Sequence, residues 1–224
     1  MDFTEILIAI VIVLSGYILG SIPFGLIFVR LSTGKDIRRV ESGRTGGTNA
    51  LRAAGFWVGA ATAICDVLKS TVTVWLARWV LPGATWLQVI APIMAVLGHN
   101  YSVFLIERTD KGTIRLHGGA GGAPTVGGLL GLWPPAFIIA GSIGLLILYF
   151  VGYASLTTLC IPLVGIIIFT YRAVLGYSPW AYVVYGIVTE GLLLLALRPN
   201  IRRLLNGTER VVGFRARRKQ GKLF

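Results

Sequence analysis

The chain is poor in charged residues, which make up only 13% of its 224 residues, whereas 55% are hydrophobic. Soluble globular domains carry about 25% charged residues, so this composition excludes an ordinary soluble protein and indicates an integral membrane protein. Roughly 20 apolar residues cross a bilayer core. Most of the chain is then needed for membrane spans, and no separate soluble domain fits in the remainder.

Cysteine and histidine are also scarce, with two of each. Cys65 and Cys160 both fall in apolar runs, where a small hydrophobic role is expected rather than a disulfide or a metal site. Two histidines make a zinc site an unexpected feature as well. We therefore expect no metal and no cofactor.

Acidic residues number nine against 21 basic ones, which gives a net charge of +12. Such an excess suits either nucleic acid or the anionic face of a membrane and anionic substrates. Because the chain consists mainly of spans, we expect membrane lipids and anionic substrates as partners, and no nucleic acid.

Apolar windows predict seven candidate spans along the chain. The fourth of them is short and rich in glycine, and by its length alone it could be re-entrant instead of spanning. The ranges are about 5–29, 56–81, 86–106, 121–133, 136–152, 155–175 and 179–197.

The basic residues decide the topology. Eighteen of the 21 lie in the segments 30–55, 107–120 and 198–224, which the positive-inside rule assigns to the cytoplasm. The last segment agrees only if the short stretch also crosses. We predict an all-α integral membrane protein with seven transmembrane helices, the N-terminus outside and the C-terminus cytoplasmic. Residues 1–214 form its one membrane domain, and 215–224 form a basic cytoplasmic tail.

A polar stretch, ESGRTGGTNALRAAG at 41–55, interrupts the apolar pattern on the predicted cytoplasmic side. Its glycines allow N–H groups to converge on an anion, and its arginines are forked donors suited to phosphate. A solvated loop with a helix N-cap at Ser42 or Thr48 is the alternative, and the residues leave both open. The candidate anion ligands are Ser42, Gly43, Arg44, Gly46, Gly47, Thr48, Asn49 and Arg52.

A second glycine cluster, GGAGG at 118–122, precedes the short predicted span. Gly118, Gly119 and Gly121 could direct N–H groups and a helix dipole at a second anion. On physical grounds alone, packing of small residues between spans is the stronger interpretation.

Few ionisable residues fall within the predicted spans. Asp66 and Lys69 are three residues apart on one helix face and are expected to pair inside the bundle. His99 ends the third span, where a structural role is favoured over acid–base chemistry. At the start of the sixth span, Ser155 is explained most simply as a helix N-cap.

Seven motifs, taken in order, resemble the PlsY family of bacterial membrane acyltransferases. They are GSIPFG (20–25), KDIRRVESGRTGGTNALRAAG (35–55), DVLKS (66–70), LGHNYSVF (97–104), GGAGGA (118–123), YASL (153–156) and NIRRLLNGTE (200–209). The resemblance covers nearly the whole chain and is highly specific.

The resemblance implies transfer of a fatty acyl group from acyl phosphate to the sn-1 hydroxyl of glycerol 3-phosphate, at the cytoplasmic face of the bacterial inner membrane. Lysophosphatidic acid and phosphate would be the products. By motif, it implies catalytic roles for Ser42, Arg52, His99, Ser155 and Asn200, and phosphate contacts from the glycine-rich segments. We expect the chain to work as a monomer.

The chain also departs from the family pattern. Arg44 stands where the family has asparagine, Ala120 where it has lysine, and Leu197 and Pro199 where it has histidine and glutamate. About nine extra residues precede GGAGG, and an alternative pairing would place Lys111 on the family lysine.

Loss of a lysine that contacts a substrate phosphate removes a charged hydrogen bond, which contributes about 1.5–3 kcal/mol to binding. Arg44, with or without Lys111, could restore the charge from the opposite loop, which gives a re-wired acyltransferase. The alternative is an inactive or substrate-shifted paralogue that acts as a lipid-binding, regulatory or transport membrane protein. A transporter would be expected to carry polar residues deep within several spans, whereas here they gather on one face.

Overall fold

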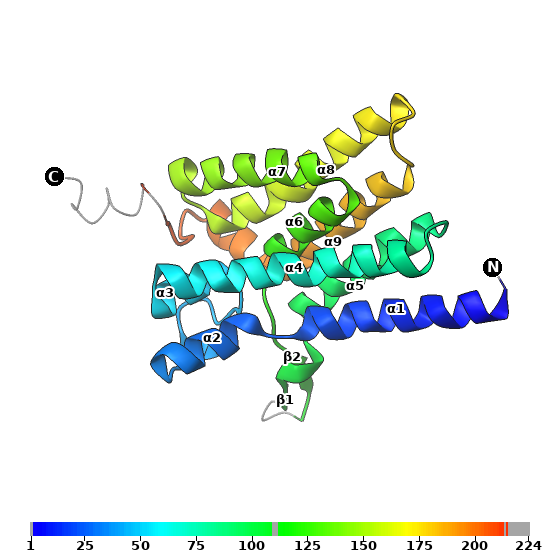
Figure 1. The fold of residues 1–224 in the computed structure, drawn as a ribbon. Coiled ribbons are helices and arrows are strands. Elements are labelled where there is room, and N and C mark those ends of the chain that lie inside the picture. The colour runs from blue at the N-terminus through cyan, green and yellow to red at the C-terminus, as the bar shows by residue number, and fades with distance from the viewer. Residues whose placement is uncertain (1, 109–111, 213, 215–224) are drawn as a thin grey trace.

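The computed structural model describes residues 2–108, 112–212 and 214, and they form a bundle of helices (Figure 1). The predicted all-helical membrane fold is confirmed at this level. The helices are α1 (Phe3–Ser21), α2 (Phe24–Thr33), α3 (Gly47–Ala54), α4 (Phe56–Val80), α5 (Thr85–Asn100), α6 (Gly122–Leu132), α7 (Pro134–Leu146), α8 (Ala154–Val174) and α9 (Ala181–Leu205), with shorter turns η1 (Ile37–Arg39), η2 (Val103–Leu105) and η3 (Ile147–Val151).

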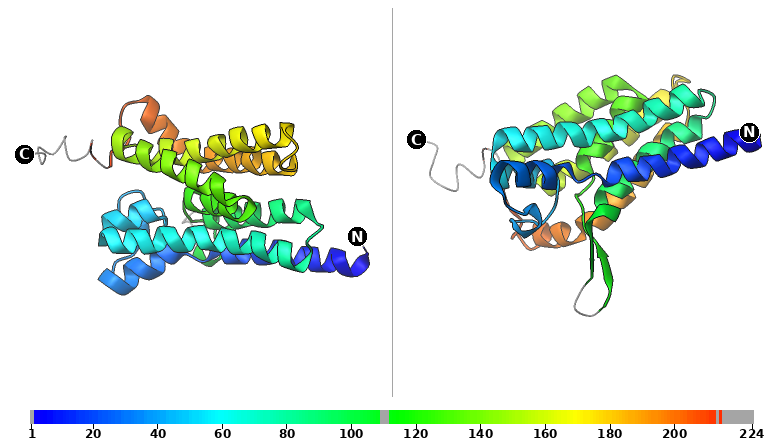
Figure 2. Two further views of the ribbon diagram at one scale, coloured as in Figure 1. Left: turned by 45° about the horizontal axis from the view of Figure 1, so that its top comes forward. Right: turned by 60° about the horizontal axis from the view of Figure 1, so that its bottom comes forward.

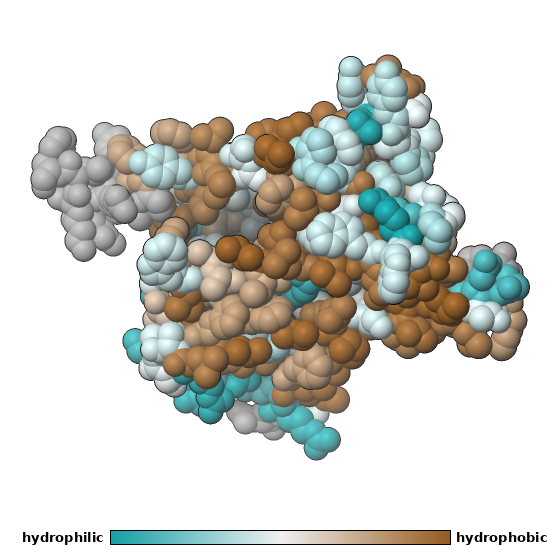
Figure 3. All heavy atoms as spheres, viewed as in Figure 1, coloured by the Kyte–Doolittle hydropathy of each residue, from teal (hydrophilic) through white to brown (hydrophobic). Residues whose placement is uncertain are grey.

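Six helical stretches in the described part of the chain are long and apolar enough to cross a membrane. Large hydrophobic side chains are exposed along them and dominate the face seen in Figure 3, as a lipid-facing surface requires. The stretches are Phe3–Thr33, Phe56–Val80, Thr85–Leu105, Pro134–Val151, Ala154–Val174 and Ala181–Leu205.

The first stretch is not the single helix predicted for 5–29. It breaks between α1 and α2 at Ile22 and Pro23, because proline has no N–H to continue the helical hydrogen bonds. The last span was predicted too short. Helix α9 continues through Pro199 to Leu205 instead of ending near 197. This extension places Asn200 on a helix rather than in a loop.

The segment predicted at 121–133 is α6, a helix of 11 residues, or about 16 Å in length. It lies between two layers of the bundle, one built from α1 to α5 and the other from α7 to α9 (Figure 2). Most of its residues are buried. A Cβ at Gly127 would collide with the carbonyl oxygen of Val67, so glycine allows α6 and α4 to pack closely.

This close packing predicts that Gly127→Val destabilises the protein. The added side chain must push α6 away from the α4 backbone, and we expect a loss of about 1–3 kcal/mol in the free energy of unfolding. Thermal unfolding of the purified protein in detergent measures it. Gly141→Val is the matched control, because Gly141 is also helical and its Cβ would meet open space. Equal melting temperatures for the two variants would contradict the packing.

A short two-stranded antiparallel hairpin, which the sequence did not predict, accompanies the helices. Strand β1 (Ile106–Arg108) pairs with β2 (Ile114–Leu116) in the register Glu107 to Arg115. The third span predicted at 86–106 agrees with the stretch Thr85–Leu105, in which α5 ends at Asn100 and the turn η2 leads into this hairpin. Figure 1 shows the hairpin projecting from the side of the bundle.

Candidate active site

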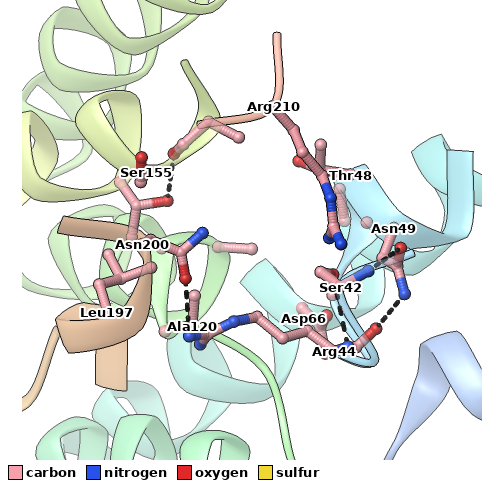
Figure 4. A pocket seen from close by; sticks show the side chains of 18 of the residues that line it. Ser42, Arg44, Thr48, Asn49, Asp66, Ala120, Ser155, Leu197, Asn200 and Arg210 are labelled. Atoms are coloured by element: carbon pink, nitrogen blue, oxygen red, sulfur yellow. Dashed lines mark hydrogen bonds between the residues drawn. The ribbon is translucent and has the colours of Figure 1, made fainter. Parts of the chain in front are cut away.

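A cavity of about 160 Å³ opens among segments that are far apart in the sequence. The polar loop before α3, the glycine segment before α6, the first turn of α8, the end of α9 and the segment after it all contribute to its wall (Figure 4). Its lining residues include Ser42, Arg44, Gly46, Gly47, Thr48, Asn49, Arg52, Asp66, His99, Ala120, Gly121, Ser155, Thr158, Leu197, Asn200, Glu209 and Arg210.

Three helices begin at this cavity. Gly46, Gly121 and Tyr153 are the N-cap residues of α3, α6 and α8, and none of these three positions supplies a side-chain cap. The first N–H groups of a helix have no acceptor within it, and the helix dipole makes this end positive. Three such ends around one cavity form a site suited to an anion.

The charged side chains of the cavity favour an anion too. Arg44, Arg52 and Arg210 line the wall, whereas the carboxylate of Glu209 is already paired with Arg203 at 3.1 Å. Burial lowers the pKa of the Arg44 guanidinium, and the charge of Arg203 lowers it further. Burial lowers the pKa of Arg52 as well. A bound phosphate would favour the charged form of both arginines.

Arg44 joins three parts of the wall. Its Nη1 donates to the carbonyl oxygen of Gly119 at 3.1 Å, and its Nη2 donates to the carbonyl oxygen of Ala196 at 2.5 Å and to Oδ1 of Asn200 at 3.0 Å. The guanidinium therefore lies beside Ala120 (Figure 4). Ala120 is the residue that the GGAGG match aligns with the family lysine.

Asn49 is turned toward the loop that precedes it. Its Nδ2 donates to the carbonyl oxygens of Ile37 at 3.2 Å, Val40 at 3.0 Å and Arg44 at 2.8 Å, and its Oδ1 accepts from the N–H of Ser42 at 3.4 Å. Although it lines the cavity, its amide hydrogens hold the loop in shape.

These bonds predict that Asn49→Asp is costly, although the two side chains have nearly the same shape. A carboxylate would face three carbonyl oxygens with no hydrogen to donate, so we expect a loss of about 1–3 kcal/mol in stability together with loss of activity. Thermal unfolding and turnover measure both effects. The same change at exposed Asn206 is the control, and an Asn49→Asp variant that matches it would refute the bracing role.

The capping alternatives from the sequence are wrong. Gly46, and not Ser42 or Thr48, is the N-cap of α3, and Ser155 is the second residue of α8 rather than its cap. The Ser155 hydroxyl is buried against the cavity with no hydrogen-bond partner in the described part of the chain. It is thus free to bind a substrate oxygen.

The glycine segment before α6 is held against His99. The N–H of Gly119 donates to the carbonyl oxygen of His99 at 2.8 Å, and the N–H of Thr45 donates to that of Gly118 at 3.3 Å. Gly121 has a positive φ of 88°, which favours glycine. The segment therefore both packs closely and begins a helix at the cavity. Gly43, also at positive φ, lies in the polar loop, and Lys111 lies outside the described residues.

Three ionisable residues of the spans, Asp66, Lys69 and His99, form a cluster, and two of them, Asp66 and His99, line the cavity. The predicted pair is confirmed, with Oδ1 of Asp66 at 2.8 Å from Nζ of Lys69. Nδ1 of His99 lies 2.9 Å from the same Nζ, a contact that sequence spacing did not predict.

Two further wall residues, Glu209 and Arg210, were not among the site residues predicted from the sequence. Glu209 accepts a hydrogen bond from Nδ2 of Asn200 at 2.9 Å, and Arg210 lies 3.4 Å from Glu41 of the polar loop. The N–H of Val212 donates to the carbonyl oxygen of Gly152, which holds this segment against the bundle.

Fold and site together define a class: an integral membrane protein with a positively charged, glycine-lined anion cavity at one end of its helices. Residues 10–207 match the family described as glycerol-3-phosphate acyltransferase. A relative from Moorella thermoacetica, glycerol-3-phosphate acyltransferase 2, is 36% identical over 89% of this chain and 95% of its own. A second, from Syntrophomonas wolfei, is 39% identical over 86% and 91%. The chain belongs to the glycerol-3-phosphate acyltransferase family.

Solved structures agree with this assignment. The fold is similar to that of PlsY, an integral membrane glycerol 3-phosphate acyltransferase, in its glycerol 3-phosphate form, with a TM-score of 0.78 and 30% identity over 92% of this chain and 96% of that one. The lysophosphatidic acid form gives a TM-score of 0.75. The resemblance read from the motifs is confirmed, and the chain is an acyltransferase of phospholipid synthesis.

Proposed function

We propose that the chain transfers an acyl group from acyl phosphate to the sn-1 hydroxyl of glycerol 3-phosphate, giving lysophosphatidic acid and inorganic phosphate. The observation that carries the proposal is the convergence of three uncapped helix N-termini and three arginines on one cavity. The two similar PlsY structures are its glycerol 3-phosphate form and its lysophosphatidic acid form, which supports glycerol 3-phosphate as the acceptor and lysophosphatidic acid as the product.

The reaction needs little more than positioning and charge neutralisation. The acceptor oxygen forms a bond to the acyl carbon, the bond from that carbon to the phosphate oxygen breaks, and the hydroxyl proton leaves with the departing phosphate. An acyl phosphate is already activated, so holding the two reactants together and stabilising two phosphates supplies much of the rate enhancement. No Ser-His-Asp arrangement is required.

The roles proposed for individual residues follow from the family motifs and, for the residues that line the cavity, from their places in its wall. Arg52, Asn200 and the hydroxyl of Ser155 contact the reacting groups, with Ser42 and His99 completing the set. Arg44, Gly46, Gly47, Thr48 and Gly121 line the cavity and contact the phosphates, and Asn49 shapes the polar loop around them. Phosphate contacts by Gly43, Gly118, Gly119 and Lys111 are proposed from the motifs alone.

We further propose that Arg44 replaces the family lysine. Its guanidinium bonds to Gly119, directly before Ala120, so that it holds positive charge beside the missing side chain. A re-wired acyltransferase is therefore favoured over an inactive paralogue, since the charge has been moved rather than lost.

The proposed setting is the bacterial inner membrane, with the cavity on the cytoplasmic face and the chain working as a monomer. Residues 1–214 would form one membrane domain in which α6 supplies a seventh, short crossing, and the basic tail 215–224 lies outside the described residues. Cysteine labelling in intact cells tests the orientation. Gly83→Cys should react with an impermeant reagent, and a cysteine at exposed Asn206 should not; the reverse pattern would overturn the topology.

The activity is tested with purified protein in lipid vesicles that contain an acyl phosphate. We expect phosphate release that depends on glycerol 3-phosphate, with one lysophosphatidic acid formed for each phosphate. Glycerol as the acceptor should give no product, because it lacks the phosphate that the cavity binds. Folded protein that releases no phosphate would overturn the proposal and favour the lipid-binding or regulatory paralogue.

A further inference from the structure

A buried cluster of ionisable residues borders the cavity, and phosphate binding alone does not explain it. Asp66, Lys69 and His99 are each at most 6% exposed, and Asp66 and His99 reach the cavity wall. Charges buried within a membrane bundle are costly, so they are expected to have a function. Bracing the helices is one such function, and orienting a group at the cavity is another.

The hydrogen-bond capacity of Lys69 constrains the neighbouring imidazole. Its ammonium group has three hydrogens and accepts none. Three acceptors surround Nζ: Oδ1 of Asp66 at 2.8 Å, Nδ1 of His99 at 2.9 Å and the carbonyl oxygen of Ile22 at 3.2 Å. Nζ hydrogen-bonds to the last two of these, whereas its contact with Oδ1 of Asp66 is an ion pair without hydrogen-bond geometry.

It follows that Nδ1 of His99 accepts and carries no proton. Oδ1 of Asp66 lies near the same nitrogen, but at 3.4 Å, so the shorter contact to a group that only donates decides the tautomer. The proton of a neutral imidazole then belongs to Nε2.

Nε2 lies on the side of the ring that faces the glycine segment, because a Cβ on Gly119 would collide with it. In the described part of the chain this nitrogen has no hydrogen-bond partner, although His99 lines the cavity. The ring thus presents an unpaired N–H donor toward the glycine segment, which is proposed to bind a substrate phosphate.

We propose that Lys69, paired with Asp66, is a positioning residue that holds His99 in its Nε2–H tautomer, so that the imidazole donates a hydrogen bond to a phosphate oxygen of the substrate. His99 is then a neutral donor and does not act as the general base. The proposal deepens the proposed acyl transfer and rests on it for the identity of the acceptor oxygen.

The tautomer can be measured without turnover. The chain has two histidines, so ¹⁵N-histidine labelling of the His117→Asn variant leaves one imidazole in the spectrum. We expect the chemical shifts of an unprotonated Nδ1 and a protonated Nε2, with Lys69→Met producing a mixture of tautomers. A protonated Nδ1 in the otherwise native protein would overturn the proposal, whatever the activity.

A double-mutant cycle separates positioning from bracing. Lys69→Met should lower kcat about 10- to 100-fold with a smaller change in KM, as for groups that orient a functional side chain. If Lys69 acts through His99, the same change in a His99→Asn background should have no further effect. If Lys69→Met lowers kcat by the same factor in the His99→Asn background as in the wild type, the proposal is overturned.

The control is Thr73→Val, which removes a buried hydroxyl from the same helix away from the cavity and should leave kcat unchanged. A wild-type protein without activity would reject the proposed acyl transfer, whereas the spectrum would still decide the tautomer.

Discussion

Replacing Arg44 by alanine should lower kcat/KM by about 10²- to 10³-fold, the largest effect expected from a single side chain here. The substitution removes the cation beside Ala120 and also the hydrogen bonds to Gly119 and Asn200 that join the polar loop to the far wall. The initial rate of phosphate release over a range of glycerol 3-phosphate concentrations measures the loss.

A second substitution separates the two roles of Arg44, namely its positive charge and its hydrogen bonds to the far wall of the cavity. If Arg44 replaces the family lysine, Ala120→Lys in the Arg44→Ala background should restore much of the activity, because it returns a cation to the same part of the cavity. Arg38→Ala is the matched control: Arg38 pairs with Asp36 at 2.7 Å, outside the cavity lining. An Arg44→Ala variant as active as Arg38→Ala would contradict the replacement.

Gly119→Ala should be the second most damaging change, with a fall of about 10²-fold in kcat/KM, although it adds one methyl group. Its Cβ would collide with Nε2 of His99, so either the ring or the glycine segment must move. Displacements of about 1 Å at a catalytic site can cost this much. Steady-state kinetics with both substrates varied measures the effect.

The comparison for Gly119→Ala is Gly83→Ala, in the connection between α4 and α5. A Cβ at Gly83 would meet open space, so this variant carries the same chemical change without a collision. It should retain full activity. If the two variants are equally active, the close contact between the glycine segment and His99 has no functional importance.

The long helices could be predicted because apolar runs of about 20 residues carry a strong signal. Smaller features depended on local or distant contacts. Pro23 ends α1, yet its position within an apolar run hid the break. The hairpin after α5 was missed because each of its strands has only three residues.

The site, too, was predicted only in part from the sequence. The polar loop and the glycine segment were marked by composition, and their meeting at one cavity is what the structure adds. The contact of Asp66 with Lys69 follows from their spacing, but His99 is 30 residues further along the chain. Arg210 could not be distinguished from the other basic residues after α9, because only the folded chain brings it to Glu41. The functional roles of the wall residues stay predictions.

The central claim is that glycerol 3-phosphate binds where the N-termini of α3, α6 and α8 meet Arg44. An experimental structure of the protein with glycerol 3-phosphate tests it most directly. The phosphate should lie within hydrogen-bonding distance of at least one of these helix N-termini and of the Arg44 guanidinium. A phosphate bound elsewhere, with this cavity empty, would contradict the account.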